Sequence, residues 1–131
     1  MQRATGNGDA MITTLIVDDE PDVLALLRII IGTANGGLVV AAEAHDGLEA
    51  VELCRSNPPT VAILDHRMPL LTGLEAAVQI LHHNPAQPIM MLSAYLEDGE
   101  LARAAELGVT VMSKRDILDV PDTLRRLAAA S

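Results

Sequence analysis

Residues 15–22 read LIVDDEPD, an apolar run followed by three acidic side chains and a proline. The apolar run begins at Met11 and predicts a buried strand that ends at Val17. Pro21 suits the first position of a helix, where the backbone N–H has no partner within the helix. Acidic groups so close together raise one another's pKa and cost folding free energy. The stretch therefore predicts a strand, a helix and, between them, either a solvated helix start or a place for a cation.

Apolar runs and helical patterns alternate along the rest of the chain. Further strands are predicted where short apolar runs are bounded by turn residues, at 38–44, 60–64, 88–93 and 109–113. Helices are predicted from Pro21 to the NGG turn at 35–37, and then at 46–55, 72–83, 97–107 and 121–130. In the first helix, the apolar residues expected to face the core are Val23, Leu26, Leu27, Ile30 and Ile31.

The alternation of strands and helices limits the fold class. Five strands that each lead into a helix imply a parallel sheet with helices on both faces. They are too few for the eight-stranded barrel, so right-handed crossovers leave an open, doubly wound sheet. We expect an α/β fold, a flavodoxin-like (βα)5 three-layer sandwich with strand order 2-1-3-4-5. In that order ligands bind beyond the carboxyl ends of the strands, at the switch point between strands 1 and 3.

Length and composition limit the class of protein. The chain has 131 residues, half of them hydrophobic, which fits one domain over residues 11–131 after a disordered N-terminal extension at 1–10. The net charge of -9 argues against direct contact with nucleic acid or with an anionic membrane. No apolar run is long enough to span a bilayer. A single cysteine, Cys54, excludes an internal disulfide and fits the cytoplasm, and we expect it to be packed rather than redox-active.

Polar side chains stand at the carboxyl ends of the predicted strands. Asp18 and Asp19 follow the first strand, and Asp65 follows the third. Ser93 ends the fourth strand and Lys114 follows the fifth. Because strands 1 and 3 flank the switch point, their carboxylates are expected to converge in one crevice, with the serine and the lysine on the same sheet edge.

This set of side chains suits magnesium and phosphoryl chemistry. Mg²⁺ is typically held by one or two carboxylates, several waters and phosphate oxygens, and it relieves the repulsion between acids. With the ion in place, a carboxylate can attack phosphorus and form an aspartyl-phosphate. A lysine and a serine hydroxyl can then bind the oxygens of the transferred group. The simpler alternative is a solvated, acidic helix start at residues 18–20. In either case Glu20 is expected to be a cap rather than a metal ligand.

At these residues the chain resembles bacterial response-regulator receiver domains of the CheY-like superfamily. The matching motifs, in the order that the family has them, are LIVDDEP (15–21), AILDHRMPLLTG (62–73), IMMLSA (89–94) and VMSK (111–114). The resemblance implies a phosphoryl-accepting switch of two-component signalling that catalyses only its own phosphorylation and dephosphorylation. Its phosphoryl donor would be a sensor histidine kinase or a phosphotransfer protein, and phosphorylation would be able to promote a homodimer. The domain would be either a free-standing receiver or part of a longer regulator, and the sequence KRD at 114–116 favours the lineage with helix-turn-helix outputs.

The resemblance also implies a role for each site residue. Asp65 would accept the phosphoryl group, with Ser93 as the switch hydroxyl and Lys114 paired to the same group. Asp19 and Asp65 would bind Mg²⁺ directly, and Asp18 would do so through water. The backbone carbonyl of Arg67 would complete the ligands from the protein.

Two positions depart from the family pattern. Val111 stands where the family has its switch aromatic, and Arg115 stands where it has a proline after a cis peptide bond. A cis bond before a residue other than proline costs about 2.5–4 kcal/mol, so we expect a trans bond and a rearranged loop after the fifth strand. These departures leave the phosphorylation site intact and bear on how the signal leaves it.

Several alternatives remain at this stage. The domain could be an interaction module that works without phosphorylation, or an Asp-nucleophile phosphatase of the haloacid-dehalogenase kind, although that family needs D-x-D where this chain has DDE. His66 could tune access to the phosphoryl group or be an ordinary loop residue. Tyr95 could shield or admit water, or its ring could simply half-cover the rim of the crevice. The neighbouring His82 and His83 should point to different sides of a helix end rather than to one metal.

Overall fold

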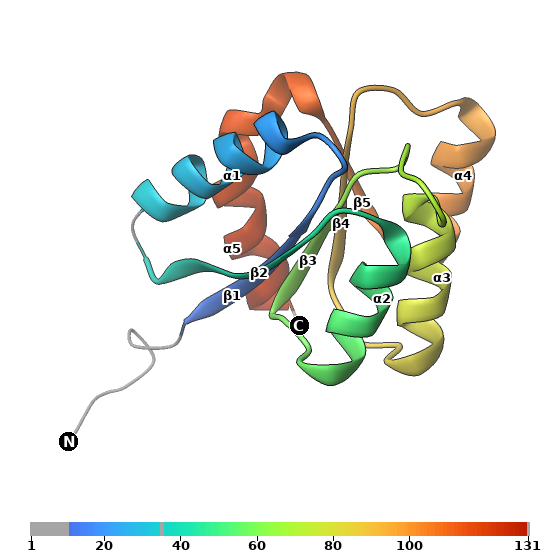
Figure 1. Cartoon of the computed structure of the whole chain (residues 1–131), viewed down its shortest axis with the longest axis horizontal. Coiled ribbons are helices and arrows are strands. Elements are labelled where there is room, and N and C mark those ends of the chain that lie inside the picture. The colour runs from blue at the N-terminus through green and yellow to red at the C-terminus, as the bar shows by residue number, and fades with distance from the viewer. Residues whose placement is uncertain (1–10, 35, 131) are drawn as a thin grey trace.

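The computed structural model describes residues 11–34 and 36–130, so the extension expected at 1–10 lies outside the described residues. Its centre is a five-stranded sheet with the strand order β2-β1-β3-β4-β5, parallel at every pairing. The strands are β1 (Ile12–Val17), β2 (Leu38–Ala44), β3 (Val61–Leu64), β4 (Ile89–Ser93) and β5 (Thr110–Ser113). The predicted strand order is confirmed, and β1 and β3 are neighbours in the middle of the sheet (Figure 1).

Helices cover both faces of this sheet (Figure 1). One face carries α1 (Pro21–Thr33) and α5 (Val120–Ala130), and the other carries α2 (Gly47–Ser56), α3 (Gly73–His83) and α4 (Asp98–Leu107). A 3-10 helix, η3 (Lys114–Asp119), leads from β5 into α5 and was not predicted. The doubly wound three-layer sandwich is therefore confirmed.

Two aliphatic cores hold the layers together, one on each side of the sheet. All four residues of β3 are buried, as expected of a central parallel strand covered on both faces. On α1, the buried positions are Leu24, Leu27 and Ile31. The predicted face included Leu26 instead of Leu24, which is wrong, because Leu26 lies away from the sheet and is 42% exposed. Leu24, Leu27 and Ile31 recur every three or four residues, so they form one stripe of the helix.

The start of α3 determines how closely the loop from β3 can fold back. Thr72 caps this helix by accepting a hydrogen bond from the Glu75 N–H at 3.2 Å, and the Glu75 carboxylate accepts one from the Thr72 N–H at 2.9 Å. Gly73 follows, and a Cβ at this position would lie 2.2 Å from the carbonyl oxygen of Asp65. Only a glycine fits there, so the packing of α3 against residue 65 depends on it.

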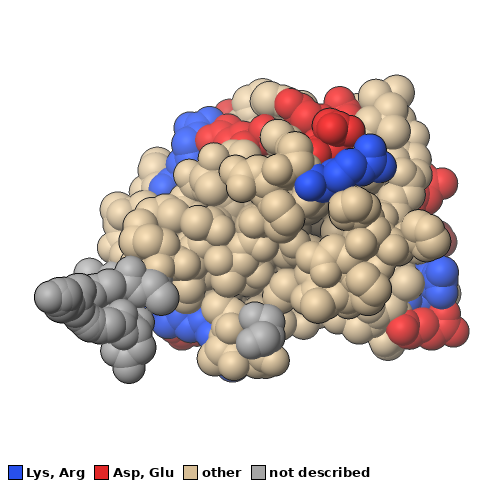
Figure 2. Space-filling view, turned by 90° about the horizontal axis from the view of Figure 1, so that it is seen from below, with Lys and Arg blue, Asp and Glu red and all other residues tan. Residues whose placement is uncertain are grey.

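Charged side chains are unevenly distributed over the surface. The face at the amino ends of the strands has few of them at its centre (Figure 2). A hollow at this end is lined largely by neutral residues, among them Leu81, Pro85 and Pro88. No helix in the described part of the chain is both long and apolar enough to cross a membrane.

Candidate functional site

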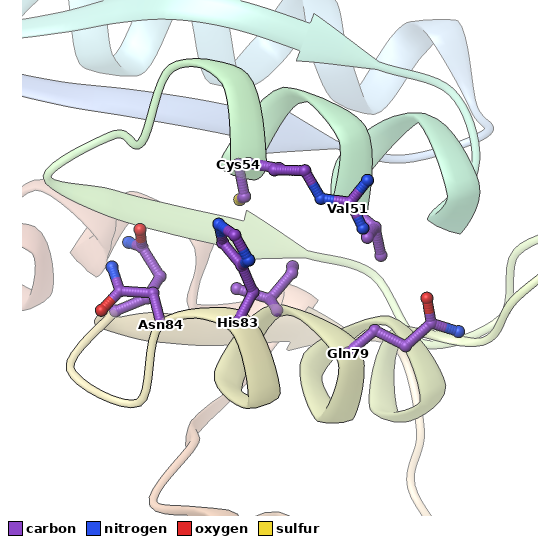
Figure 3. A pocket seen from close by; sticks show the side chains of 8 residues that line it. Val51, Cys54, Gln79, His83 and Asn84 are labelled. Carbon is purple, nitrogen blue, oxygen red and sulfur yellow. The ribbon is translucent and has the colours of Figure 1, made fainter.

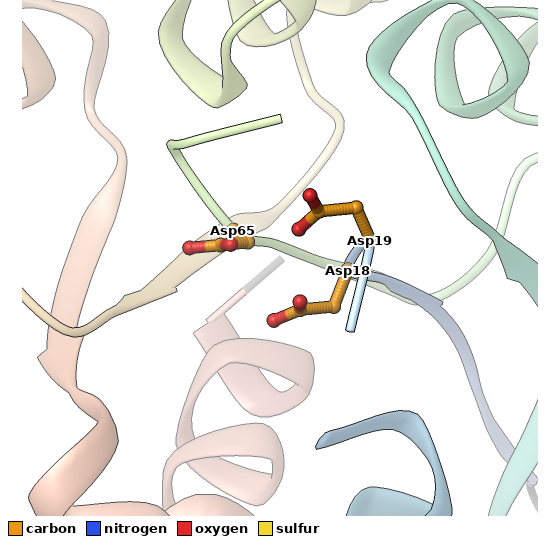
Figure 4. Close-up of side chains that lie close together, drawn as sticks. All are labelled: Asp18, Asp19 and Asp65. Carbon is orange, nitrogen blue, oxygen red and sulfur yellow. The ribbon is translucent and has the colours of Figure 1, made fainter. Parts of the chain in front are cut away.

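Three carboxylates meet beyond the carboxyl ends of β1 and β3 (Figure 4). One oxygen from each of Asp18, Asp19 and Asp65 lies within 4.8 Å of the other two. The two strands place them there, because Val17 and Leu64, their last residues, are paired in register. The predicted convergence of these side chains at the switch point is therefore what the structure contains.

The three acids differ in their exposure to solvent. Asp18 and Asp65 are buried, with 1% and 4% of their surface exposed, whereas Asp19 is exposed. Asp18 accepts a hydrogen bond from the Glu20 N–H at 2.9 Å, and Asp65 accepts one from the His66 N–H at 2.8 Å. Burial raises the pKa of Asp18 above its ordinary value, although the Glu20 N–H opposes that shift. The site therefore holds a carboxylate that a nearby cation would stabilise.

Lys114 supplies one such cation from the end of β5. Its Nζ lies 2.9 Å from Asp18 Oδ2, 3.4 Å from Asp65 Oδ2 and 3.2 Å from Glu20 Oε1. Burial alone would lower the pKa of Lys114, but the hydrogen bond to Asp18 and the charge of Asp65 hold it above its ordinary value. Glu20 occupies the N-cap position of α1, yet its side chain makes no capping hydrogen bond. The prediction that Glu20 acts as a cap is therefore wrong for its side chain, which binds Lys114.

Two of the three aspartates border an open cavity of about 260 Å³, which is lined by Asp19, Glu20, Asp65, Arg67, Ser93, Ala94 and Lys114. The hydroxyl of Ser93 donates a long hydrogen bond, 3.4 Å, to the carbonyl oxygen of Tyr95. The Tyr95 side chain is 67% exposed and does not line this cavity, which is not the half-covered rim of one of the two alternatives for this ring. The cavity brings oxygen ligands, a cation and a hydroxyl to one place, which is what binding of Mg²⁺ and a phosphoryl group requires.

The ring of His66 does not lie where it could tune access to the phosphoryl group, which was the less favoured alternative for this residue. The imidazole is buried and does not line the cavity beside Asp65. Its Nδ1 accepts a hydrogen bond from the Leu74 N–H at 3.3 Å, and its Nε2 lies 2.9 Å from Glu100 Oε2. A direct effect of this ring on access to Asp65 is therefore excluded in this conformation.

Glu100 is the residue of this region that the sequence did not reveal. The pKa of its carboxyl is lowered to about 2, because the carboxylate accepts hydrogen bonds from the Glu97 N–H and from Arg67. In the sequence Glu100 was only one of the acids in the first turn of a helix, which the helix dipole favours. No local sequence pattern indicated the contacts of Glu100, because its partners, His66 and Arg67, lie more than thirty positions earlier in the chain.

Cys54 lies on α2, away from the carboxylates, beside a small cavity between α2 and α3 (Figure 3). The thiol is buried, and burial raises its pKa to about 11. The cavity measures about 10 Å³, at most the size of one water molecule. His83 also borders it, and both His82 and His83 belong to the last turn of α3, as predicted. Cys54 is thus a packed residue, as expected.

The loop after β5 has the rearrangement expected from Arg115. The described residues contain no cis peptide bond. The Arg115 N–H instead donates to Ser113 Oγ at 3.2 Å, and the chain turns into η3. Val111, on β5, is 37% exposed. The lysine therefore reaches the acids without the proline that the family pattern has after it.

The fold and this site define the class of protein. The model of the response regulator receiver domain family matches residues 14–117, and the chain belongs to that family. It is 35% identical over 98 residues to the chemotaxis protein CheY of Listeria monocytogenes, an alignment that covers 75% of this chain and 81% of that protein.

Longer proteins and solved structures give further matches. A protein-glutamate methylesterase/protein-glutamine glutaminase of Methanosarcina mazei is 36% identical over 103 residues, which cover 77% of this chain but 28% of that protein. The chain therefore spans under a third of the methylesterase's length. The response regulator domain of Thermotoga maritima CheB superimposes with a TM-score of 0.83 at 26% identity, covering 92% of this chain and 98% of that one. A LuxR-family response regulator from Aurantimonas gives a TM-score of 0.85 at 26% identity, covering 92% and 87%.

Proposed function

We propose that this receiver domain is a phosphoryl-accepting switch in a two-component, His-Asp phosphorelay, and that Asp65 carries the phosphoryl group. The observation that carries the proposal is the meeting of Asp18, Asp19 and Asp65 within 4.8 Å beside the Nζ of Lys114. Acids packed this closely are costly unless a cation joins them, and a buried aspartate at a sheet edge with a lysine 3.4 Å away suits phosphoryl transfer.

The residues present fit a magnesium ion. Asp19 and Asp65 are the direct carboxylate ligands in this proposal, and the backbone carbonyl of Arg67 is a third ligand. Asp18, whose carboxylate is already paired with Lys114 at 2.9 Å, acts through water. Such a mixture of carboxylate, carbonyl and water oxygens is what Mg²⁺ takes in proteins. When bound, the ion neutralises charge on the phosphoryl oxygens.

The chain's own groups then have separate tasks. A carboxylate oxygen of Asp65 attacks phosphorus as the phosphorus–nitrogen bond of a phosphohistidine breaks, and the imidazole leaves with its electron pair. Lys114 binds one equatorial oxygen of the transferred group, and Ser93 turns its hydroxyl from the Tyr95 carbonyl to another. Hydrolysis of the aspartyl-phosphate by water resets the domain. The chain has no external metabolite as substrate, so it catalyses only these two reactions on itself.

The partners follow from this chemistry. The donor is a sensor histidine kinase or a phosphotransfer protein in the cytoplasm, and phosphorylation alters a surface for a downstream output, homodimer formation included. With a net charge of -9, this chain does not itself contact nucleic acid or a membrane. Regulation of transcription would require a further domain.

The direct test is labelling with a small phosphodonor. Acetyl phosphate with Mg²⁺ should add the mass of one phosphoryl group to the intact protein, and hydroxylamine should remove it. Asp65→Asn should abolish the adduct, while Asp119→Asn, an exposed acid of η3, should leave it at the full level. Full labelling of the Asp65→Asn protein would refute the assignment.

A second candidate is an interaction module of the same fold that works without phosphorylation. The exposed Val111 in place of a switch aromatic favours it. Such a module has no need for Mg²⁺, so binding of the ion in the millimolar range separates the two functions. An Asp-nucleophile phosphatase is the least favoured of the candidate functions. It would be recognised by catalytic hydrolysis of one or more phosphomonoesters from a panel.

A further inference from the structure

The carboxylate of Glu100 is fully used by four hydrogen bonds. Its Oε1 accepts from the Glu97 N–H at 2.9 Å and from Arg67 Nη2 at 2.9 Å. Its Oε2 accepts from Arg67 Nη1 at 3.0 Å and lies 2.9 Å from His66 Nε2. A carboxylate offers about four acceptor positions, so none of them remains for water. The pair with Arg67 is bidentate, which restricts the geometry more than a single contact does.

The hydrogen bonds between Glu100 and the loop after β3 form a link, and His66 restrains this link on the side of the loop. Its Nδ1 accepts the Leu74 N–H, so the ring hydrogen is on Nε2 and points to Glu100. The His66 side chain is 4% exposed, and that of Glu100 is 21% exposed. The His66–Glu100 contact is therefore shielded from water on the His66 side, whereas the Arg67 side chain is 51% exposed and its pair with Glu100 lies at the surface. Any shift of the backbone at 66–67 therefore has to move the carboxylate or break several hydrogen bonds at once.

The helix that carries Glu100, α4, buries few of its own side chains. Of the ten residues of α4, Ala104 alone is classed as buried. The helix lies at the outer edge of its layer, beyond α3 (Figure 1). Glu100 belongs to its first turn, where it also bonds the N–H of Glu97, the N-cap residue. Glu100 thus joins the start of α4 to the loop after β3, and the core contact of Leu96, just before the helix, holds the same end.

We propose that Glu100 is a positioning residue that couples the phosphorylation site to α4 through His66 and Arg67. These two residues directly follow Asp65, and the Arg67 carbonyl is a metal ligand in the proposed function, on which this inference rests. Filling the site shifts the backbone at 66–67 and thereby the first turn of α4, and the placement of α4 in turn changes the affinity of the site. This route does not use position 111, where the chain has a valine.

Hydrogen exchange followed by mass spectrometry tests the coupling. The protein is compared with and without acetyl phosphate and Mg²⁺, and the ratio of exchange rates is taken for the amides of residues 98–104. The variants are Glu100→Gln and His66→Leu, which breaks the link at a side chain that does not line the cavity. The control is Glu106→Gln, because Glu106 pairs with Arg103 inside the same helix at 3.1 Å. Intact mass measures the phosphoryl adduct in every sample.

The expected result is a rate ratio of about 5-fold or more in the wild-type protein and in the Glu106→Gln protein, the lower end of typical allosteric coupling. Both variants of the link should give a ratio near one although the adduct still forms. A merely structural role would change the exchange rates in both states and leave the ratio intact, and that outcome overturns the coupling. A wild-type protein that forms the adduct without a response in α4 also overturns it. A wild-type protein without any adduct refutes the proposed function itself.

Discussion

Neighbouring aspartates at the end of β1 have opposite environments. Asp18 is buried against Lys114, and its pKa is raised by burial, whereas Asp19 is exposed. The folded state therefore binds a proton at Asp18 more readily than the unfolded state does. The stability that this carboxyl contributes is full below its unfolded pKa and is lost as the pH rises through its folded pKa. At neutral pH the cost of burying a charge falls on Asp18, whereas the exposed Asp19 is accessible to an ion.

The exposure of Asp19 leads to a prediction about metal binding. Asp19→Asn should weaken Mg²⁺ binding by about tenfold or more, because it removes a charged ligand. The free energy of unfolding without metal should change by no more than about 0.5 kcal/mol, as is usual for exposed sites. Calorimetric titration and urea denaturation measure the two quantities. Asp22→Asn, an exposed acid in the first turn of α1, is the control, and equal Mg²⁺ affinity in both variants would contradict the ligand role.

Gly73 allows a second prediction at the scale of one residue. Gly73→Ala places a methyl group 2.2 Å from the Asp65 carbonyl oxygen, so the backbone must move, at a cost of about 1–3 kcal/mol. The yield of phosphoryl adduct should fall as well, since the shifted residue is Asp65. Gly32→Ala is the matched control, because its added Cβ would meet nothing within 4 Å and alanine favours a helix. If both substitutions proved equally harmless in urea denaturation, the close packing at Gly73 would be refuted.

At the scale of elements, periodicity and turn residues predicted every strand and every α-helix, because each element carries its own apolar pattern. They also predicted the strand ends at which Asp18, Asp65 and Lys114 converge. Periodicity and turn residues did not predict the features that tertiary contacts determine. On α1 two overlapping stripes have helical spacing, and only packing against the sheet selects the one that contains Leu24. The short helix η3 after β5 carried no apolar pattern of its own. The hydrogen bonds from Glu100 to the β3–α3 loop could not be predicted from the pattern of α4 alone, because they join residues far apart in the sequence.

The interface between α2 and α3 carries a prediction about Cys54. Since burial raises its thiol pKa to about 11, almost no thiolate exists at pH 8. The stability that the thiol contributes is full below its unfolded pKa, 9.0, and is lost as the pH rises through about 11. Alkylation by iodoacetamide at pH 8 should therefore be slower than in the urea-unfolded protein by at least about a hundredfold, as followed by intact mass. Comparable rates in the two states would show that the interface opens readily.

For the whole molecule, the acidic cluster makes stability depend on the ion. Mg²⁺ at about 100 times its dissociation constant should raise the free energy of unfolding by about 2.7 kcal/mol, because the ion binds the folded state. Sodium chloride at equal ionic strength should give a smaller rise, through screening of the net charge of -9. Thermal unfolding measures the stabilisation by each salt. In the Asp65→Asn protein, the extra stabilisation by Mg²⁺ over sodium chloride should be lost. An equal effect of the two salts would mean that screening alone is at work.

The scarcity of aromatic residues has a practical consequence for spectroscopy. Tyr95 is the only tyrosine, and the chain has no tryptophan. Its backbone carbonyl accepts the hydrogen bond of Ser93, the hydroxyl that is expected to turn toward a phosphoryl group. Ultraviolet fluorescence of the native protein therefore comes from one fluorophore, two residues after Ser93 in the chain. A change in its emission lifetime or anisotropy would report on occupancy of the site in real time, without a label or an introduced side chain.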